Sequence, residues 1–267
     1  MNQGLKMNSV ISHTCKVLKI KPLNADTFEV ELKSIENTAL SYKAGQYLQL
    51  KLDVNNDGEQ TALSYSIANR LDPRQPKRLQ LFIHNNSAFS NKVLNRLGEI
   101  HKESAHLDVN LPLGQAFLQT NLDLPHVLVA AGSGISKIKC LTEEILAQKP
   151  TTNVHIYWSN KSVNDFYLVN EFQNWANQHP SLSFHPILET AHAHWAGRTG
   201  LIYEVLKADF NNLSETQAYL CGSPNMVYGT IDQLKTIGLK EHNCYSDVFE
   251  YAPREQKWRF NSKLIIQ

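Results

Sequence analysis

The sequence is poor in the features that mark several large classes of protein. Only four cysteines occur among 267 residues, at Cys15, Cys140, Cys221 and Cys244, and they are far apart. No CxxC pair or Cys/His cluster predicts zinc, and the C-x4-C-x2-C spacing of a plant-type iron–sulfur cluster is missing. We therefore expect no metal, no iron–sulfur cluster and, in a reduced compartment, no disulfide.

Charge of one sign and long apolar runs are also scarce. Lys and Arg number 26, Asp and Glu number 25, and the formal net charge is only +1. That balance gives no reason to expect nucleic acid or a membrane as a partner. The longest apolar stretches, such as 127–131, are far shorter than the ~18 residues of a membrane-spanning helix. The N-terminus lacks the pattern of a secretory signal, so we expect a cytoplasmic protein.

Short alternating segments dominate the chain up to residue 115. In 28-FEVELK-33, Phe28, Val30 and Leu32 share one face and charged side chains the other, which predicts a half-buried antiparallel strand. Six such segments favour a small closed antiparallel barrel. A helix is expected at 90–97, with Val93, Leu94 and Leu97 as its apolar stripe. The expected strands are 13–20, 28–33, 46–52, 62–68, 79–83 and 106–111.

Beyond residue 117 the pattern changes to strands that alternate with helices, which is typical of βαβ units around a parallel sheet. The expected strands are 126–131, 154–159, 182–188, 218–222 and 244–249, and the expected helices are 136–147, 164–177, 200–208 and 224–238. We therefore divide the chain into a flexible N-terminus (1–11), a barrel domain (12–120), an α/β domain (121–254) and a tail (255–267).

Two glycine-containing turns carry the strongest chemical signals. In 127-VLVAAGSGIS-136 a strand runs through Gly132 and Gly134 into an apolar-periodic helix, an arrangement that lets backbone N–H groups approach a pyrophosphate. The same glycines also suit an ordinary tight βα turn. In 220-LCGSPNM-226 a strand end leads into a helix begun by Pro224. Cys221 would there lie at the ligand-binding edge of the sheet, or serve as a small buried hydrophobe.

A third segment, 63-LSYSIAN-69, lies in the predicted barrel. Tyr65 can pack against a flat ring, and the Ser66 hydroxyl can hydrogen-bond a ring nitrogen. Alternating Tyr and Ser are also common in strands without any ligand. The segment gains meaning only from the order of the motifs along the chain.

Taken in order, the motifs over residues 10–252 resemble the ferredoxin–NADP reductase superfamily. The matching elements are 44-AGQY-47, L-S-Y-S-I-A-N in place of R-x-Y-S, 111-LPLG-114 with Phe117, AGSGIS for the G-T-G-I loop, and the C-G-x-x-x-M helix start. Within the superfamily the chain is most similar to the bacterial NAD(P)H:flavin oxidoreductases, including those that supply luciferase. That similarity rests on 155-HIYWSNK-161, 195-WAGRTG-200 and 246-SDVF-249.

The resemblance implies a flavin-binding barrel, an NAD(P)-binding α/β domain and a role for individual residues. Tyr65 would lie against the flavin ring, Ser66 near its N5 atom, and Phe249 over part of one flavin face. Ser66 and Cys221 would be the catalytic pair. The implied flavin-binding residues are Leu63, Ser64, Tyr65, Ser66, Ile83, His84, Ser90 and Phe249. The implied NAD(P)-binding residues are Gly132, Ser133, Gly134, Ile135, Lys161, Cys221, Gly222, Pro224 and Met226.

Three positions depart from the family pattern. Leu63 stands where relatives have the arginine that binds the flavin phosphate, and Ser87 where many have glycine. Loss of a charge-assisted phosphate contact typically costs about 1.5 to 3 kcal/mol, roughly ten- to a hundredfold in affinity. We therefore expect weak retention of flavin. Lys161 replaces an arginine near the adenosine 2′-phosphate, or is a solvated loop residue, and both NADH and NADPH stay open.

These observations predict an oxidoreductase that passes a hydride from NADH or NADPH to FMN, riboflavin or FAD. The reduced flavin would then serve ferric complexes or a monooxygenase. One alternative is a reductase with bound flavin that passes electrons to a separate iron–sulfur protein. A second is an electron-transfer or regulatory subunit that has lost independent catalysis. His192 and His194 show no metal-ligand spacing and are expected at the surface.

Overall fold

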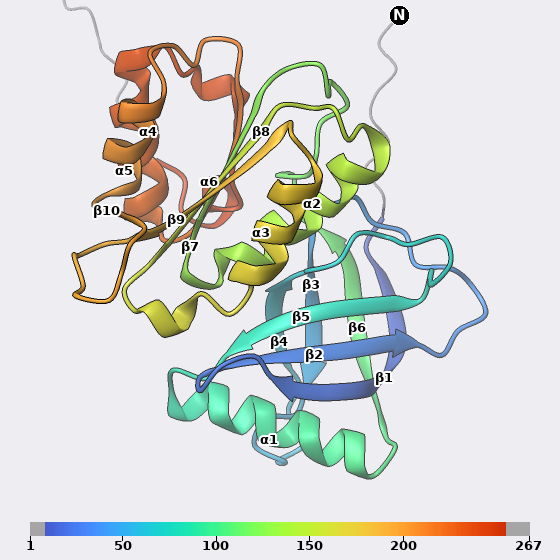
Figure 1. Ribbon diagram of the computed structural model, residues 1–267. Coiled ribbons are helices and arrows are strands. Elements are labelled where there is room, and N and C mark those ends of the chain that lie inside the picture. The colour runs from blue at the N-terminus through green and yellow to red at the C-terminus, as the bar shows by residue number, and fades with distance from the viewer. Residues whose placement is uncertain (1–8, 255–267) are drawn as a thin grey trace, which may run out of the picture.

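The computed structural model describes residues 9–254, and in it the first half of the chain forms a six-stranded antiparallel sheet (Figure 1). The strand order is β4-β3-β6-β1-β2-β5, and every neighbouring pair is antiparallel. Its strands are β1 (Ile11–Pro22), β2 (Thr27–Ser34), β3 (Tyr47–Leu52), β4 (Thr61–Ser66), β5 (Arg78–His84) and β6 (His106–Leu113).

The sheet curls into a barrel because the apolar side chains, which alternate along each strand, are buried together in one core. Val30 and Leu32 of β2 are fully buried in the core, as their alternation predicts. Close to the two edge strands, the Ala68 N–H donates to the Gln80 carbonyl at 2.8 Å, which helps to close the barrel. Helix α1 (Ala88–Lys102) packs its buried stripe, which includes Val93, against this core (Figure 1).

The second half of the chain forms a six-stranded parallel sheet in the order β10-β9-β8-β7-β11-β12. Its strands are β7 (His126–Ala131), β8 (Val154–Asn160), β9 (Leu182–Leu188), β10 (Arg198–Thr199), β11 (Gln217–Cys221) and β12 (Cys244–Tyr245). The chain moves outward from β7 to β10 and then returns to β11 on the other side of β7. In such a sheet the crevice beside the carboxyl ends of the central strands is the usual ligand site.

Helices cover both faces of the parallel sheet (Figure 1). They are α2 (Ile135–Gln148), α3 (Val169–Gln178), α4 (Ile202–Asp209), α5 (Pro224–Leu234) and α6 (Val248–Tyr251), with short 3-10 turns at Gly132–Gly134, Val163–Asp165, Lys235–Ile237 and Glu241–Asn243. Along β7, Leu128 faces the core under α2 and α3, whereas Val129 faces the core under α4 and α5. A strand buried on both faces explains the continuous apolar run 127-VLVAA-131.

The predicted fold class is confirmed, and the differences lie at element ends. The expected strand at 244–249 stops at Tyr245, and α6 follows, because Ser246 and Asp247 begin a turn in which backbone N–H groups from Phe249 and Glu250 bond back. Strand β10 was not predicted, since two residues carry no periodicity. Helix α3 begins at Val169 instead of 164, after a separate 3-10 turn.

The barrel and the parallel sheet share one apolar core where they meet. Ala44, Ala68 and Phe82 of the barrel half belong to the same buried cluster as Ile138 and Leu141 of α2. Their contact brings the end of β4 close to the start of α2. This junction positions the site described next.

Candidate functional site

A cavity of about 330 Å³ opens between the end of β4 and the carboxyl edge of the parallel sheet. The barrel contributes Ser66, which we call the barrel wall. The turn after β7 and the end of β11 contribute the nucleotide wall, namely Ala131, Ser133, Gly134, Leu220, Cys221, Gly222 and Ser223. The remaining lining comes from Lys137 of α2 and from the segment around α6, with Asp247 and Tyr251.

The turn after β7 has a shape that glycine alone permits. Gly132 lies in the left-handed region with φ of 55°. At Gly134 an added Cβ would lie 2.3 Å from the carbonyl oxygen of Cys221, which is closer than real Cβ atoms approach. The missing side chain therefore lets the start of α2 touch the end of β11. The aligned peptides of α2 place partial positive charge at this end of the helix, where an anionic group is favoured.

The end of β11 is equally compact. The Cys221 side chain is buried, and desolvation raises the pKa of its thiol to about 12, so the thiol is neutral at physiological pH. An added Cβ at Gly222 would meet the Met226 side chain at 2.2 Å. Helix α5 then begins with Pro224 in its first turn, and the Ser223 hydroxyl accepts from the Met226 N–H at 3.3 Å.

An ion pair that the sequence analysis missed joins α2 to the α6 segment within the lining of this cavity. Lys137 Nζ lies 2.7 Å from Asp247 Oδ1, and the lysine side chain is only 2% exposed. A lysine inside an amphipathic helix reads as a surface residue, and no short-range pattern links positions 110 residues apart in sequence. Asp247 does lie in the 246-SDVF-249 segment that carries part of the resemblance, and this was the one available signal.

The α6 segment also contacts the barrel. Glu250 Oε1 accepts the Gln115 N–H at 2.6 Å, and an added Cβ on Gly114 would lie 3.3 Å from Asp247 Oδ1. Tyr251, which is 64% exposed, lines the cavity beside these contacts. The C-terminal part of the described chain thus closes one side of the cavity.

The predicted flavin residues fall into two groups. Tyr65 and Leu63 lie half-buried against the barrel core, on the same face of β4. Burial raises the pKa of the Tyr65 phenol, which therefore stays neutral at physiological pH. Ser66 lines the cavity and Ser64 is exposed, both on the opposite face of β4. The structure brings only Ser66 from this segment to the nucleotide wall.

Three other predicted flavin contacts have structural partners. Ile83 is 1% exposed within the barrel core, so its side chain is not accessible to a ligand. His84 Nδ1 lies 3.1 Å from Thr27 Oγ1. Ser90 forms a reciprocal capping box with Ser87 at the start of α1, which explains why serine at position 87 suits this helix.

Several predicted contacts lie outside the cavity lining, among them Phe249, Lys161 and Ile135. Phe249 packs against Tyr228 of α5, with ring centroids 5.7 Å apart, and Tyr251 from the same helix lines the cavity instead. Phe249 does not line the cavity, and its contact with the flavin stays a prediction. Lys161 is exposed in the loop after β8 and does not line the cavity. Ile135 is fully buried and anchors the first turn of α2.

Comparison with known proteins places the parallel-sheet half in a family. Residues 128–231 match the family described as oxidoreductase NAD-binding domain. That range contains both turns of the nucleotide wall, after β7 and after β11. This half of the chain is therefore similar to the NAD-binding domains of oxidoreductases. The predicted family resemblance and enzyme class are thereby confirmed.

The chain is also similar to individual proteins over most of its length. The NAD(P)H-flavin reductase of Aliivibrio fischeri is 27% identical over 242 residues, 89% of this chain and 98% of that protein. The CDP-6-deoxy-L-threo-D-glycero-4-hexulose-3-dehydrase reductase of Yersinia pestis is 29% identical over 242 residues, 89% of this chain and 69% of that protein. Among solved structures, an Amycolatopsis cytochrome P450 reductase superposes with a TM-score of 0.76 at 22% identity, covering 91% of this chain and 71% of that one.

Metal-binding clusters and membrane-spanning helices are both absent from the described residues, 9–254. From residue 9 to residue 254, no three His, Cys, Asp or Glu side chains gather in a way that would hold a metal ion. Within the same range, no helix combines the length and the apolar character that crossing a membrane requires.

Proposed function

We propose that this chain is an NAD(P)H:flavin oxidoreductase that transfers a hydride from a nicotinamide to a weakly held flavin. The observation that carries the proposal is the single cavity in which Ser66 of the barrel faces the glycine turn and the end of β11. The two rings of such a reaction must stack at near contact, and the protein contributes mainly their orientation. The similarity to proteins named NAD(P)H-flavin reductase supports the same reading.

The nucleotide wall fits a nicotinamide dinucleotide. Gly134 lets the turn pack directly against the end of β11. At Gly132 the backbone is open, which leaves room for a pyrophosphate. In this proposal residues 132–135 hold the phosphates, while Cys221, Gly222, Pro224 and Met226 lie along the nicotinamide half. Because burial keeps the Cys221 thiol protonated, with a pKa of about 12, it acts by contact and not as a nucleophile or a base.

The barrel wall fits a flavin ring edge. When bound, the flavin supplies the N5 atom that accepts the hydride. The Ser66 hydroxyl would hydrogen-bond near that atom and hold the ring in one orientation, while Tyr65 would pack on the ring. At position 63 the neutral leucine packs against the barrel core and offers no charge for a phosphate. This favours FMN, riboflavin or FAD as a substrate that exchanges with solution.

Two other relatives suggest a second function. The Yersinia pestis protein is named a reductase of a dehydrase, and the Pseudomonas putida relative is the ferredoxin–NAD(P)(+) reductase component of a dioxygenase system. A chain of this kind would keep its flavin and pass electrons to a separate protein, whereas a flavin-releasing reductase would serve a monooxygenase or ferric complexes. Leu63 favours the flavin-releasing function.

The test is the visible spectrum of the purified protein, followed by NADH and NADPH oxidation with and without FMN, riboflavin or FAD. We expect colourless protein that oxidises the nicotinamide only after flavin is added, and Ser66→Ala to slow that reaction at saturating substrates. Yellow protein that reduces an electron acceptor without added flavin would favour the second function. Failure to oxidise either nicotinamide under all these conditions would contradict both and favour a regulatory subunit.

A further inference from the structure

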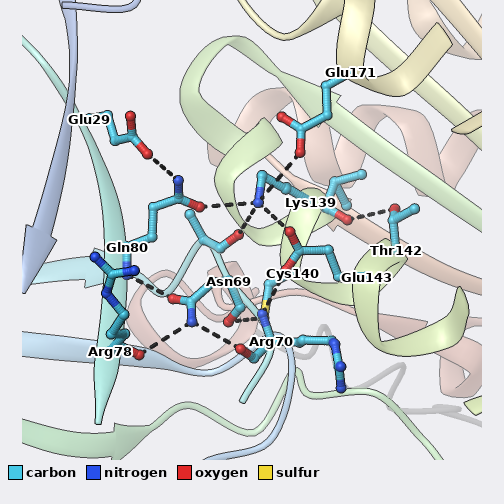
Figure 2. Close-up of polar contacts among 12 residues, drawn as sticks. Glu29, Asn69, Arg70, Arg78, Gln80, Lys139, Cys140, Thr142, Glu143 and Glu171 are labelled. Carbon is cyan, nitrogen blue, oxygen red and sulfur yellow. Dashed lines mark hydrogen bonds and ion pairs between the residues drawn. The ribbon is translucent and has the colours of Figure 1, made fainter. Parts of the chain in front are cut away.

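One face of α2 holds the barrel segment that directly follows Ser66. Figure 2 shows Lys139, Cys140 and Glu143 of α2 facing residues Asn69 and Arg70. Three contacts join them in order. Lys139 Nζ donates to the Ala68 carbonyl at 3.4 Å, Cys140 Sγ to the Asn69 carbonyl at 3.0 Å, and the Arg70 N–H donates to Glu143 Oε2 at 2.8 Å. We call these three α2 residues the α2 clamp.

The clamp is buried and its members support one another. The Lys139 side chain is 7% exposed, Cys140 is fully buried, and Glu143 is 21% exposed. Lys139 also pairs with Glu143 one turn along the helix and donates to Gln80 Oε1 at 3.1 Å (Figure 2). Glu171 of α3 lies 3.7 Å from the same ammonium. A buried ammonium with this many acceptors has little freedom to move.

On the barrel side the clamped segment is equally constrained. The Asn69 side chain donates to the Arg70 carbonyl at 2.9 Å and to the Arg78 carbonyl at 3.3 Å, and it accepts the Gln80 N–H at 2.7 Å. Tyr42 adds a further hydrogen bond to the Asn69 carbonyl at 3.2 Å. The segment is therefore hydrogen-bonded on one side to α2 and on the other to β5.

The clamp lies on a short route between the two walls of the cavity, made of two chain segments and the hydrogen bonds that join them. On one side, Ser66 is two residues before Ala68. On the other, Lys139 is one helical turn after Ile135, which directly follows the glycine turn of the nucleotide wall. The clamp therefore connects the barrel wall to the nucleotide wall without lining the cavity between them.

We propose that Lys139, supported by Glu143, is a positioning residue that sets the distance between the two rings during hydride transfer; this rests on the proposed function. Neither residue lines the cavity around Ser66, so neither binds the reacting atoms. A misplacement of about 1 Å costs up to roughly a hundredfold in rate when a reaction depends on near contact. The clamp acts on the hydride step while leaving the binding of each substrate almost unchanged.

The test compares Lys139→Met with Lys139→Arg, and uses Lys149→Met as a matched control. Lys149 ends the same helix and pairs with Asp123, which lies outside the clamp. For Lys139→Met we expect the rate at saturating NADH and flavin to fall about ten- to a hundredfold. The Michaelis constants should change little, and the isotope effect with deuterated NADH should rise. Lys139→Arg should restore most of the rate, and Lys149→Met should match the parent protein.

Two results would overturn the proposal. One is an unchanged rate and isotope effect in Lys139→Met. The other is a loss of rate that comes with weaker flavin binding and a lower melting temperature and that Lys139→Arg fails to rescue, because this pattern indicates a structural role alone.

A second measurement needs no flavin and separates this proposal from the proposed function. Hydrogen exchange of the peptide that covers residues 66–71 should become faster in Glu143→Ala, since the Arg70 N–H loses its acceptor. Exchange in β1 should stay the same. If the parent protein reduces no flavin, the proposed function fails while the exchange result still decides whether the clamp holds the segment. Unchanged exchange at residues 66–71 would contradict the clamp itself.

Discussion

The two walls of the cavity are built in different ways. The nucleotide wall consists mostly of backbone and small side chains from two neighbouring parallel strands, with Gly134 in contact with Cys221. The barrel wall consists of one side chain, Ser66, whose position depends on contacts between the two halves of the molecule. The shape of the nucleotide wall therefore follows from the two βα turns and their direct contact. The position of the barrel wall depends on the contacts between the barrel and helices α2 and α6.

The largest effect should come from the ion pair between Lys137 of α2 and Asp247 beside α6. Asp247→Ala leaves Lys137, only 2% exposed, as a buried charge without its partner. Breaking a buried pair in this way costs about 3 to 5 kcal/mol of unfolding free energy. Lys137→Met should cost less, because Asp247 is 24% exposed and water can solvate it. Denaturant unfolding of both variants checks this order, and an equal loss in the two would contradict the burial argument.

The next largest effect should be on flavin affinity, after a substitution in the barrel half. Leu63→Arg restores a charge at the position where relatives bind the flavin phosphate. We expect FMN to bind roughly ten- to a hundredfold more tightly, which corresponds to about 1.5 to 3 kcal/mol. Riboflavin, which has no phosphate, is the control and should bind as before. Fluorescence titration measures both, and an equal gain for the two flavins would show that the arginine acts without the phosphate.

A change in the nucleotide wall should affect the nicotinamide alone. Gly134→Ala places a Cβ against the Cys221 carbonyl, so the turn must shift to make room for it. Overpacking of this kind costs about 1 to 3 kcal/mol. If nucleotide binding has to restore the original turn, this cost corresponds to a roughly 5- to 150-fold loss of nucleotide affinity. The dissociation constant of NADH should rise by a factor in that range while FMN affinity stays within about twofold. A matching loss of FMN affinity would mean that the two walls are not independent.

The smallest effect concerns the Cys221 thiol. Its pKa is raised to about 12 by burial, so the thiol stays protonated at neutral and mildly alkaline pH. Cys221→Ala should therefore leave the shape of the pH–rate profile between pH 6 and pH 10 unchanged, a window chosen to lie below that pKa. Iodoacetamide should modify the folded parent protein slowly. If the parent protein showed a pH-dependent change of rate in that window and Cys221→Ala did not, the thiol would take part in the chemistry.

Much of the fold is readable in the sequence because each half has a clear hydrophobic period. Val30 and Leu32 show the period of two, and the 127–131 run shows a strand buried on both faces. The element ends were less predictable. Val248 and Phe249 looked like the end of a strand, yet they begin α6, because the backbone turns at Ser246 and Asp247, whose carbonyl groups accept N–H groups from Phe249 and Glu250.

The candidate site divides along the same line. The nucleotide wall could be predicted, since a glycine turn between a strand and a helix is a local arrangement. The family resemblance assigned Phe249 to the flavin, whereas in the structure Phe249 packs on Tyr228 and Tyr251 lines the cavity. The orientation of one short helix decides between the two residues, and no local pattern encodes it.

By itself, the sequence determined the antiparallel and parallel sheets, the glycine turn with Gly132 and Gly134, and the class of cofactor that such a turn accepts. The tertiary structure alone decided that Lys137 meets Asp247 and that Lys139 holds the segment after Ser66. The physical reason is the distance along the chain over which each interaction acts. Periodicity and turn geometry act over a few residues, whereas a buried lysine finds its partner only after distant segments have packed and water has been excluded.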